Sequence, residues 1–325
     1  EAKGGGFVDN RDTLQRHGHA ALAPSLQAED YIRASRSPNT LRAYRSDWQQ
    51  FVDWCNSRRL SSLPAAETTV CRYLAEQAEQ DKVSTLSRRV ASISQAHQAA
   101  GHPSPTQSLS VRATLKGIRR KKTSMTTEKA PVLVADLRKM VDTLGDSLMG
   151  KRDRALLLVG FAGAFRRSEL VSLNAEDIAF DHNGLTIQLR RSKTDQEGDG
   201  RKVGLPYGGN PATCPVRALQ EWLSAAAISS GALFVGINRH GTPKGRLSAC
   251  AVALIVKKVV AATGLNPALY AGHSLRAGLA TSAAMAGVSE RSIMNQTGHK
   301  SVQMVRRYIR DGSLFRENAA AGIGL

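Results

Sequence analysis

Residues 271–310 read AGHSLRAGLATSAAMAGVSERSIMNQTGHKSVQMVRRYIR, and the interpretation of the whole chain starts from this stretch. His273 and Arg276 are three residues apart, so on a helix they share one face. His299 follows a glycine at a break between two helical patterns, and Tyr308 comes nine residues later among arginines. A tyrosine hydroxyl attacks well only when a neighbour takes its proton, and cations stabilise a reacting phosphate. The stretch therefore predicts a tyrosine that attacks a phosphodiester.

Each of these residues also has an ordinary structural interpretation. A single tyrosine near a helix end is usually a half-buried packing residue with a solvated hydroxyl. A histidine and an arginine three positions apart are common on solvated helix faces. The functional interpretation depends on the whole set occurring in order, together with counterparts earlier in the chain.

The chain has 325 residues, enough for two domains, and it is strongly basic. It carries 45 Lys and Arg against 27 Asp and Glu, a net charge of +18. Residues 1–128 contribute +7 (19 basic, 12 acidic) and residues 129–325 contribute +11 (26 basic, 15 acidic). Charge spread over the whole length favours a protein that wraps a polyanion, although a ribosomal or RNA-coating protein would be equally basic.

The cysteines and the apolar runs suggest a cytoplasmic location. Cys55, Cys71, Cys214 and Cys250 are far apart, so a disulfide framework or a structural zinc site is not expected, and a reducing compartment fits. The longest apolar run, residues 155–165, is too short to span a bilayer. No charged and then apolar leader opens the chain, so neither secretion nor a membrane partner is expected.

The first part of the chain predicts a loose arm followed by a helical domain. Residues 1–21 are rich in glycine and polar residues and show no period. At Ser37 an N-cap serine and a proline precede apolar residues at helical spacing, which predicts a helix to about Arg58. The segment 22–122 is expected to form this domain, and the basic segment 123–131 a linker. Its further helices are expected at Glu67–Glu79, Ser84–Ala100 and Ser108–Lys122.

Residues 132–325 predict a second domain that adds a small sheet to its helices. The alternation of Leu185, Ile187 and Leu189 with polar residues predicts a strand, and Val203 and Leu205 alternate beyond a turn. The expected fold class is therefore mainly α with a small antiparallel β-sheet. Helices are expected at Val134–Leu144, Asp153–Phe161, Pro215–Ala227, Ser248–Thr263, His273–Ala286, Glu290–Asn295 and Val302–Tyr308.

Three charged residues of the second domain extend the candidate site. Arg166 falls at a helix entrance, where an arginine reaches an anion that the helix dipole also favours. Glu169 is placed to hold Arg166; the alternative is an ordinary surface ion pair. Lys193 lies where the hairpin begins to turn, and its alternative is a solvated lysine at a sheet edge.

These motifs together resemble the tyrosine recombinase (phage integrase) family. The segment R-R-S-E-L at 166–170 resembles the family motif R-x-S-E-L, and H-S-L-R at 273–276 is similar to its H-x-L-R box. The pair G-H at 298–299 and Tyr308 match the spacing of its last two catalytic positions. Lys193 resembles its mobile catalytic lysine, and S-P-N-T-L-R-A-Y is similar to the opening helix of its core-binding domain. The segment A-G-V-S-x-x-x-I-M resembles Cre-like members.

The resemblance implies a two-domain clamp, in which a helical core DNA-binding domain is joined to a mixed α/β catalytic domain with a C-terminal tail for protomer exchange. It implies that the tyrosine attacks the scissile phosphate, that arginines hold its oxygens, and that a lysine protonates the leaving oxygen. The histidines act as acid, base or phosphate ligand, and no metal or other cofactor is needed. The catalytic residues would be Tyr308, Arg166, Arg276, Lys193, His273 and His299, supported by Glu169.

The implied partner is a double-stranded DNA recombination site of the inverted-repeat type, bound by a homotetramer on two sites, with accessory proteins unknown. Two alternatives share the chemistry or the scaffold: a type IB topoisomerase that works as a monomer, and a non-catalytic DNA-binding protein. A metal-dependent nuclease is disfavoured because paired carboxylates are lacking. The candidate DNA contacts are Arg42, Arg45, Arg88, Arg89, Arg119, Arg120, Lys121 and Lys122.

Overall fold

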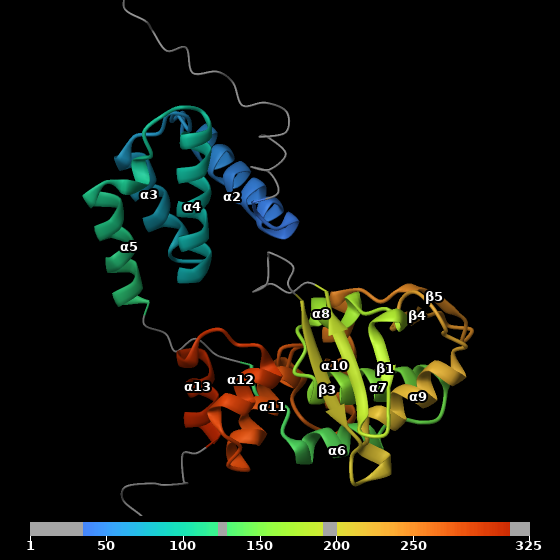
Figure 1. Ribbon diagram of the computed structural model, residues 1–325. Coiled ribbons are helices and arrows are strands. Elements are labelled where there is room, and N and C mark those ends of the chain that lie inside the picture. Colours follow the sequence, from blue (N-terminus) through green and yellow to red (C-terminus); the bar gives the residue numbers. More distant parts are fainter. Residues whose placement is uncertain (1–34, 123–128, 191–199, 313–325) are drawn as a thin grey trace, which may run out of the picture. The chain divides into compact units, whose positions relative to one another are not determined.

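The chain folds as two separate units, as a computed structural model shows (Figure 1). The units comprise Glu1–Met125 and Thr126–Leu325. The structure describes residues 35–122, 129–190 and 200–312. Lys193 and the expected N-terminal arm lie outside the described residues.

The first unit is helical and is built around an aromatic core. Its helices are α2 (Pro38–Ser57), α3 (Glu67–Gln77), α4 (Val83–Ala99) and α5 (Leu109–Lys121), with a short 3₁₀ turn at Pro105–Gln107. The core packs Phe51 and Trp54 of α2 against Tyr73 of α3, with ring centroids 5.0 to 5.1 Å from Tyr73. Burying one such ring contributes about 1.5–3 kcal/mol.

The expected starts of two helices are confirmed at their caps. The Ser37 side chain accepts a hydrogen bond from the Thr40 backbone N–H, with Pro38 in the first helical position. Ser108 caps α5 by accepting from the Val111 N–H. Each such cap contributes about 1 kcal/mol because it satisfies a backbone donor that the helix leaves unpaired.

The second unit places its helices around a buried central helix, α7 (Leu148–Ala162). Ten residues of α7 are buried, which explains why its sequence shows no clear polar face. This helix contacts α9 (Pro215–Ala225), α11 (Ser274–Met285), α6 (Val134–Asp142) and α8 (Arg167–Ser172). The remaining helices are α10 (Ala249–Ala262), α12 (Glu290–Thr297) and α13 (Val302–Gly312), with 3₁₀ turns at Ala175–Asp177, Pro211–Thr213 and Pro267–Leu269.

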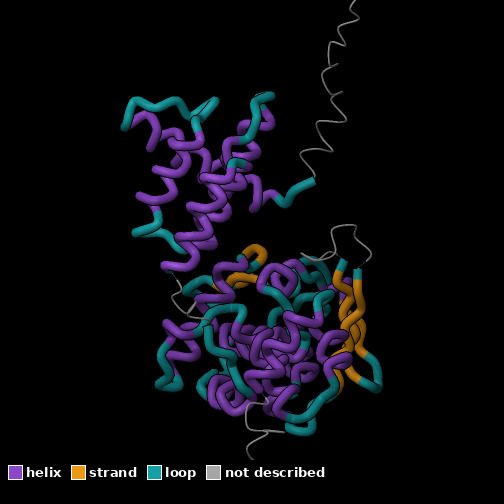
Figure 2. The backbone as a smooth tube through the Cα atoms, turned by 90° about the vertical axis from the view of Figure 1, so that its left-hand side faces the viewer, coloured by secondary structure: helices purple, strands orange, loops and turns teal. Residues whose placement is uncertain are grey.

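Two small antiparallel sheets complete this unit, and Figure 2 shows its strands at the periphery. One sheet has the order β1 (Ile178–Phe180), β2 (Gly184–Leu189), β3 (Arg201–Pro206), and its register pairs Leu189 with Arg201. The alternating apolar residues of β2 and β3 face the core, as the sequence indicates. The other sheet pairs β4 (Val235–Ile237) with β5 (Pro243–Arg246). The prediction of a mainly α fold with small antiparallel sheets is confirmed.

The structure differs from the sequence-based expectations in three places. Helix α7 begins five residues earlier than expected because Ser147 caps it, accepting from the Gly150 N–H. The strands β1, β4 and β5 were not expected because they are short and gain their pairing from distant segments. Residues 129–132 bond to the second unit: the Ala130 N–H donates to Leu269 and the Val132 N–H to Ser274. Residues 129–131 of the expected linker therefore belong to the second unit.

No helix in the described part of the chain is long and apolar enough to cross a membrane.

Candidate active site

Helix α11 carries His273 as its N-cap and Arg276 in its first turn. Arg276 is 1% exposed, and its Nη1 donates to the carbonyl of Ala164 at 2.6 Å. Ala164 adopts a φ of 50°, which is unusual for a residue with a side chain. This turn between α7 and α8 thus aims a carbonyl at the arginine, and backbone strain of this kind gathers at functional sites.

Arg166 lies just after that turn, as the N-cap of α8. Its backbone N–H donates to Glu169 Oε2 at 2.9 Å, and its guanidinium pairs with Glu169 Oε1. The Glu169 side chain is only 2% exposed, so it holds Arg166 from inside the protein. The sequence left open whether the two form a surface pair or a held arginine, and the structure shows a held arginine.

His299 enters the site through a left-handed glycine at the end of α12. Gly298 has a φ of 65°, a conformation that glycine adopts without strain. Arg276 Nη2 donates to His299 Nε2 at 3.1 Å, and His299 Nδ1 lies 2.7 Å from Thr297 Oγ1. Thr297 Oγ1 donates in turn to the carbonyl of Ile293 at 2.7 Å. This series of hydrogen bonds assigns the neutral form of His299 with the proton on Nδ1, because Nε2 must accept the hydrogen bond from Arg276.

Tyr308 comes from α13, and its hydroxyl lies 2.9 Å from His273 Nε2. Its ring centroid is 5.9 Å from that of His299. The ring also packs on a small cluster formed by Ala280, Ala284, Ile293 and Val305. Helices α11, α12 and α13 therefore bring two histidines, one arginine and the tyrosine together, although 35 residues separate His273 from Tyr308.

The site is electrically positive, and its histidines are neutral near pH 7. Burial, and then the charges of Arg276 and Arg166, lower the pKa of His299 to about 4. His273 is exposed as a residue, but its ring is partly shielded from water. This burial, and then the charge of Arg276, also lower the pKa of His273. Burial and Arg166 lower the pKa of Arg276 to about 10, so it stays protonated. A neutral histidine beside a tyrosine, among arginines, suits proton transfer next to a bound anion.

Sequence reasoning missed two arginines at this site. Arg201 of β3 donates from Nη1 to the carbonyl of Gln296 at 3.1 Å, at the end of α12. Arg167 is exposed, and its side chain lies so close to Gly272 that a Cβ there would fall 2.1 Å from Arg167 Cδ. Arg167 could have been found from the sequence, because it is adjacent to Arg166. Arg201 could not, because its contact with Gln296 joins distant parts of the chain.

The basic residues expected to contact DNA have different environments in the first unit. Arg42, Arg45, Arg119 and Arg120 are exposed. Arg88 is half exposed and pairs with Asp47. Lys121 is exposed, and Lys122 Nζ donates to the carbonyl of Asp81.

Arg89 corrects one expectation. Its side chain is 6% exposed, and its Nη1 contacts Asp81 at 2.7 Å and Gln77 at 2.8 Å. Burial takes this guanidinium off the surface, so Arg89 is not available for a DNA contact. The apolar stripe of α4, with Leu86 and Ile93 at helical spacing, already places position 89 on the inner face.

The described residues contain no group of three or more His, Cys, Asp or Glu that could hold a metal ion. The charged groups of the site are arginines, with Glu169 as the carboxylate that contacts one of them.

The helical unit and the mixed unit with its tyrosine, histidines and arginines define a site-specific tyrosine recombinase, and comparisons with known proteins agree. The sequence pattern of the phage integrase family matches residues 132–313, and that of its N-terminal SAM-like domain matches residues 29–102. The chain therefore belongs to the phage integrase family.

Two relatives span most of the chain. A protein named integrase/recombinase xerD homolog, from Selenomonas ruminantium, is 44% identical over 300 residues, which cover 91% of this chain and 88% of that protein. The recombinase cre of Escherichia phage P1 is 24% identical over 302 residues, covering 86% of each chain. Segment 286–294 resembles Cre-like members, but the chain as a whole is more similar to the xerD homolog than to the recombinase cre.

Solved structures share the fold. A lambda integrase dimer bound to a COC′ core site matches with a TM-score of 0.61 and 17% identity, over 90% of this chain and 77% of that one. XerH recombinase bound to a palindromic difH substrate, in a post-cleavage complex, matches with a TM-score of 0.60 and 19% identity, over 79% and 72%.

Proposed function

We propose that this chain cleaves and rejoins double-stranded DNA at a specific site, with Tyr308 as the nucleophile. The observation that carries the proposal is the 2.9 Å contact between the Tyr308 hydroxyl and His273 Nε2, beside Arg276 and Arg166. Lowering the pKa of His273 leaves Nε2 free to accept the phenol proton. The family and the DNA-bound structures that share its fold support DNA as the partner.

The proposed chemistry combines the geometry of the described residues with the role that the family resemblance implies for Lys193. The tyrosine oxygen attacks the scissile phosphorus while its proton passes to His273, and the 5′-oxygen leaves as a new 3′-phosphotyrosine bond forms. Arg166 and Arg276 bind the non-bridging oxygens, and each such contact lowers the barrier by about 3–4 kcal/mol. His299 accepts from Arg276 and so orients its guanidinium. The leaving oxygen takes a proton from Lys193. One phosphodiester replaces another, so the reverse attack by a DNA hydroxyl rejoins the strand without an external energy source.

The test uses DNA sites selected by this protein from a random duplex pool and rebuilt with a nick, so that the cleaved strand fragment diffuses away. The wild-type chain should form a covalent adduct that survives denaturing electrophoresis. Tyr308→Phe removes only the hydroxyl, so it should bind the same duplex and form no adduct. An adduct with Tyr308→Phe would identify another nucleophile, and a wild-type chain that binds without an adduct would be a non-catalytic DNA-binding protein.

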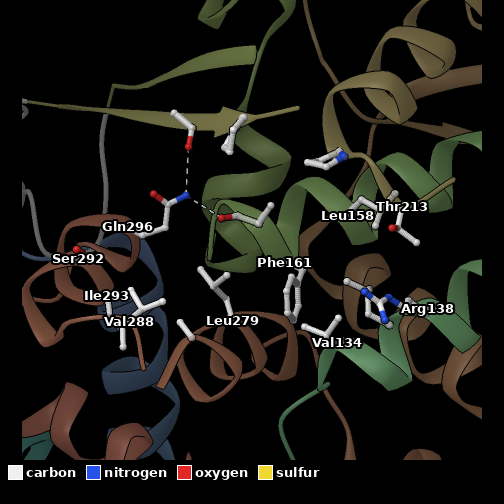
Figure 3. Close-up of a pocket in the computed structure, with 16 residues that line it drawn as sticks. Val134, Arg138, Leu158, Phe161, Thr213, Leu279, Val288, Ser292, Ile293 and Gln296 are labelled. Carbon is white, nitrogen blue, oxygen red and sulfur yellow. Dashed lines mark hydrogen bonds between the residues drawn. The ribbon is translucent and has the colours of Figure 1, made fainter. Parts of the chain in front are cut away.

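We further infer that four protomers assemble on two such sites, exchange strands through a Holliday junction, and are linked by residues 313–325. An apolar cavity of about 490 Å³ in the second unit supports the last part of this inference, the link between protomers (Figure 3). It is lined by Val134, Phe161, Leu279, Val288 and Ile293, from α6, α7, α11, α12 and the loop before α12. The segment 313–325 offers apolar side chains of matching character, at Leu314, Phe315, Ile323 and Leu325. We assign the cavity to this segment of a neighbouring copy.

The assembly is tested with a chain that ends at Asp311 and with Val288→Asp, which places a charge at the 44% exposed rim of the cavity. Both should bind one site and fail to join two labelled sites in a native gel. Leu254→Asp is the matched control, because Leu254 is 67% exposed and does not line the cavity. Normal four-protomer complexes with the shortened chain would show that the tail does not link protomers. Relaxation of supercoiled DNA without strand exchange would instead indicate a topoisomerase.

A further inference from the structure

Arg201 connects the small sheet to the end of α12. Its Nη1 donates to the carbonyl of Gln296 at 3.1 Å and lies 3.4 Å from that of Asn295. These carbonyls belong to the last turn of α12, where a helix leaves its acceptors unpaired. A cation at this end also meets the negative end of the helix dipole. Arg201 therefore caps the helix that leads into His299.

The contact extends to the turn itself. A Cβ on Gly298 would lie 2.9 Å from both Cζ and Nε of Arg201, closer than real Cβ atoms come to other groups. The guanidinium is thus packed directly against the left-handed turn, and His299 is the next residue. The φ of 65° favours glycine here, and a larger residue would also displace the Arg201 guanidinium.

This arrangement is unfavourable for stability alone. Burial is the main cause that lowers the pKa of Arg201; the Glu169 carboxylate opposes this, and the charge of Arg166 adds to it. The Nη2 of Arg201 is buried and has no hydrogen-bond partner among the described residues. A buried donor left unpaired has lost its hydrogen bonds to water without replacement. Unpaired buried atoms also occur elsewhere among the described residues, at Tyr73 and Arg89. The contact with the end of α12 and with the Gly298 turn is what distinguishes Arg201.

We propose that Arg201 is a positioning residue for the recombination reaction: it fixes the end of α12 and, through the Gly298 turn, holds His299 against Arg276. This inference rests on the proposed function of the site. The affected contact is the 3.1 Å hydrogen bond between Arg276 Nη2 and His299 Nε2. A displacement of about 1 Å in such a contact lowers a rate by about 100-fold.

The first experiment measures single-turnover adduct formation on the selected nicked site, at a protein concentration that saturates the DNA. Arg201→Met keeps the length of the side chain and removes its charge and donors, so the rate should fall by about 10- to 100-fold. Arg201→Lys should restore part of this loss, because an ammonium still reaches one carbonyl. Lys202→Met is the matched control: it removes the same charge from the next, exposed position of β3 and should leave the rate unchanged.

The second experiment separates positioning from direct action by combining Arg201→Met with His299→Ala. If Arg201 acts through His299, the double variant should be no slower than His299→Ala alone. Two losses that multiply would mean that Arg201 acts independently, for example on the phosphate, and would overturn the proposal. A wild-type rate for Arg201→Met would also overturn it.

Thermal unfolding accompanies both experiments. If Arg201→Met does not fold, Arg201→Lys replaces it in the cycle, and failure of both to fold would assign Arg201 to stability and reject the proposal. If the wild-type chain forms no adduct, the proposed function fails, and this outcome is distinct from a normal adduct that does not depend on Arg201.

Discussion

Both units of the chain bury arginines, and Arg89 and Arg276 differ in what surrounds them. Arg89 of the first unit is 5% exposed and contacts the carboxylate of Asp81 and the amide oxygen of Gln77. Arg276 of the second unit is 1% exposed and contacts a backbone carbonyl and a neutral histidine. No carboxylate of the described residues lies within salt-bridge distance of Arg276.

The difference shows that the partners of a buried arginine, rather than its burial, reveal its role. A buried charge without a counter-ion costs several kcal/mol, so proteins rarely keep one without a reason. Arg89 is neutralised within its own unit by Asp81, although its Nε has no hydrogen-bond partner among the described residues. Arg276 has no carboxylate in direct contact, although the charge of Glu169 acts on it from a greater distance, and a phosphate bound beside Arg166 and His299 would supply a direct counter-ion.

The comparison predicts first that exposed cations, and not Arg89, carry the salt dependence of DNA binding. With on the order of 10 phosphates neutralised, log K should fall with log[salt] at a slope near −9. Arg42→Met should reduce the slope by about 1, because each phosphate contact contributes about one unit. Arg89→Met should leave the slope unchanged. Fluorescence anisotropy over a salt series measures this, and a wild-type slope shallower than about −3 would contradict DNA contacts from both units.

The second prediction concerns Arg276, which has no carboxylate in direct contact. Arg276→Met should lower the single-turnover cleavage rate by about 10²- to 10³-fold, because a cation for the developing charge is lost. Its free energy of unfolding should not decrease, since the substitution removes a buried charge that has no carboxylate partner. Urea unfolding and adduct formation are measured on the same preparation. A variant that is destabilised in proportion to its loss of activity would place Arg276 with the structural arginines.

Arg89, which is paired with Asp81, should affect stability and not the cleavage rate. Arg89→Met should lower the free energy of unfolding by about 1–3 kcal/mol, because Asp81 and Gln77 lose a charged partner. Once the DNA is saturated, its cleavage rate should match that of the wild-type chain. Arg45→Met, an exposed substitution on α2, is the control and should unfold like the wild type. If Arg89→Met slows cleavage of bound DNA, the two arginines are not as different as their contacts indicate.

The smallest expected effect is the pH dependence that follows from the lowered pKa of His299, which is caused by burial and then by the neighbouring arginines. Its folded-state pKa of about 4 lies below its ordinary value of 6.5, so the unfolded chain takes up the proton first as the pH falls. The stability that His299 contributes is therefore complete above pH 6.5 and is lost as the pH falls to about 4. The loss is on the order of 1 kcal/mol, because water screens this partly exposed ring. His299→Asn should flatten the profile between these values in urea unfolding, and an unchanged profile would contradict the lowered pKa.

Much of this fold could be predicted because its signals are local. Ser37 and Ser108 mark helix starts by cap chemistry, and the alternation along β2 and β3 marks a pair of strands. The order and spacing of the motifs indicated the residues that α11, α12 and α13 bring together. Such signals survive in a single sequence because neighbouring residues carry them.

The rest depends on contacts between distant segments. Nothing near Arg201 in the sequence indicates that it caps α12, because that contact joins residues 95 positions apart. The three-residue strand β1 forms only through its pairing with β2. Arg89 is an intermediate case: the helical period places it inside, but its basic side chain and its neighbour Arg88 favoured a surface interpretation. The roles of Lys193 and of the tail 313–325 remain predictions.

The entry of the chain into the second unit has a mechanical consequence. The Val132 N–H donates to the carbonyl of Ser274 at 2.9 Å, and a Cβ on Gly278 would overlap the Val132 carbonyl at 1.9 Å. The segment that enters the second unit is thus bonded to and packed along the first turns of α11, the helix that carries Arg276. Residues 129 and 130 are bonded to the turn at Pro267–Leu269, through Lys129 Nζ to the carbonyl of Ala268 and the Ala130 N–H to that of Leu269. The segment that enters the second unit is therefore fixed both to the helix of the reaction centre and to the turn that precedes it.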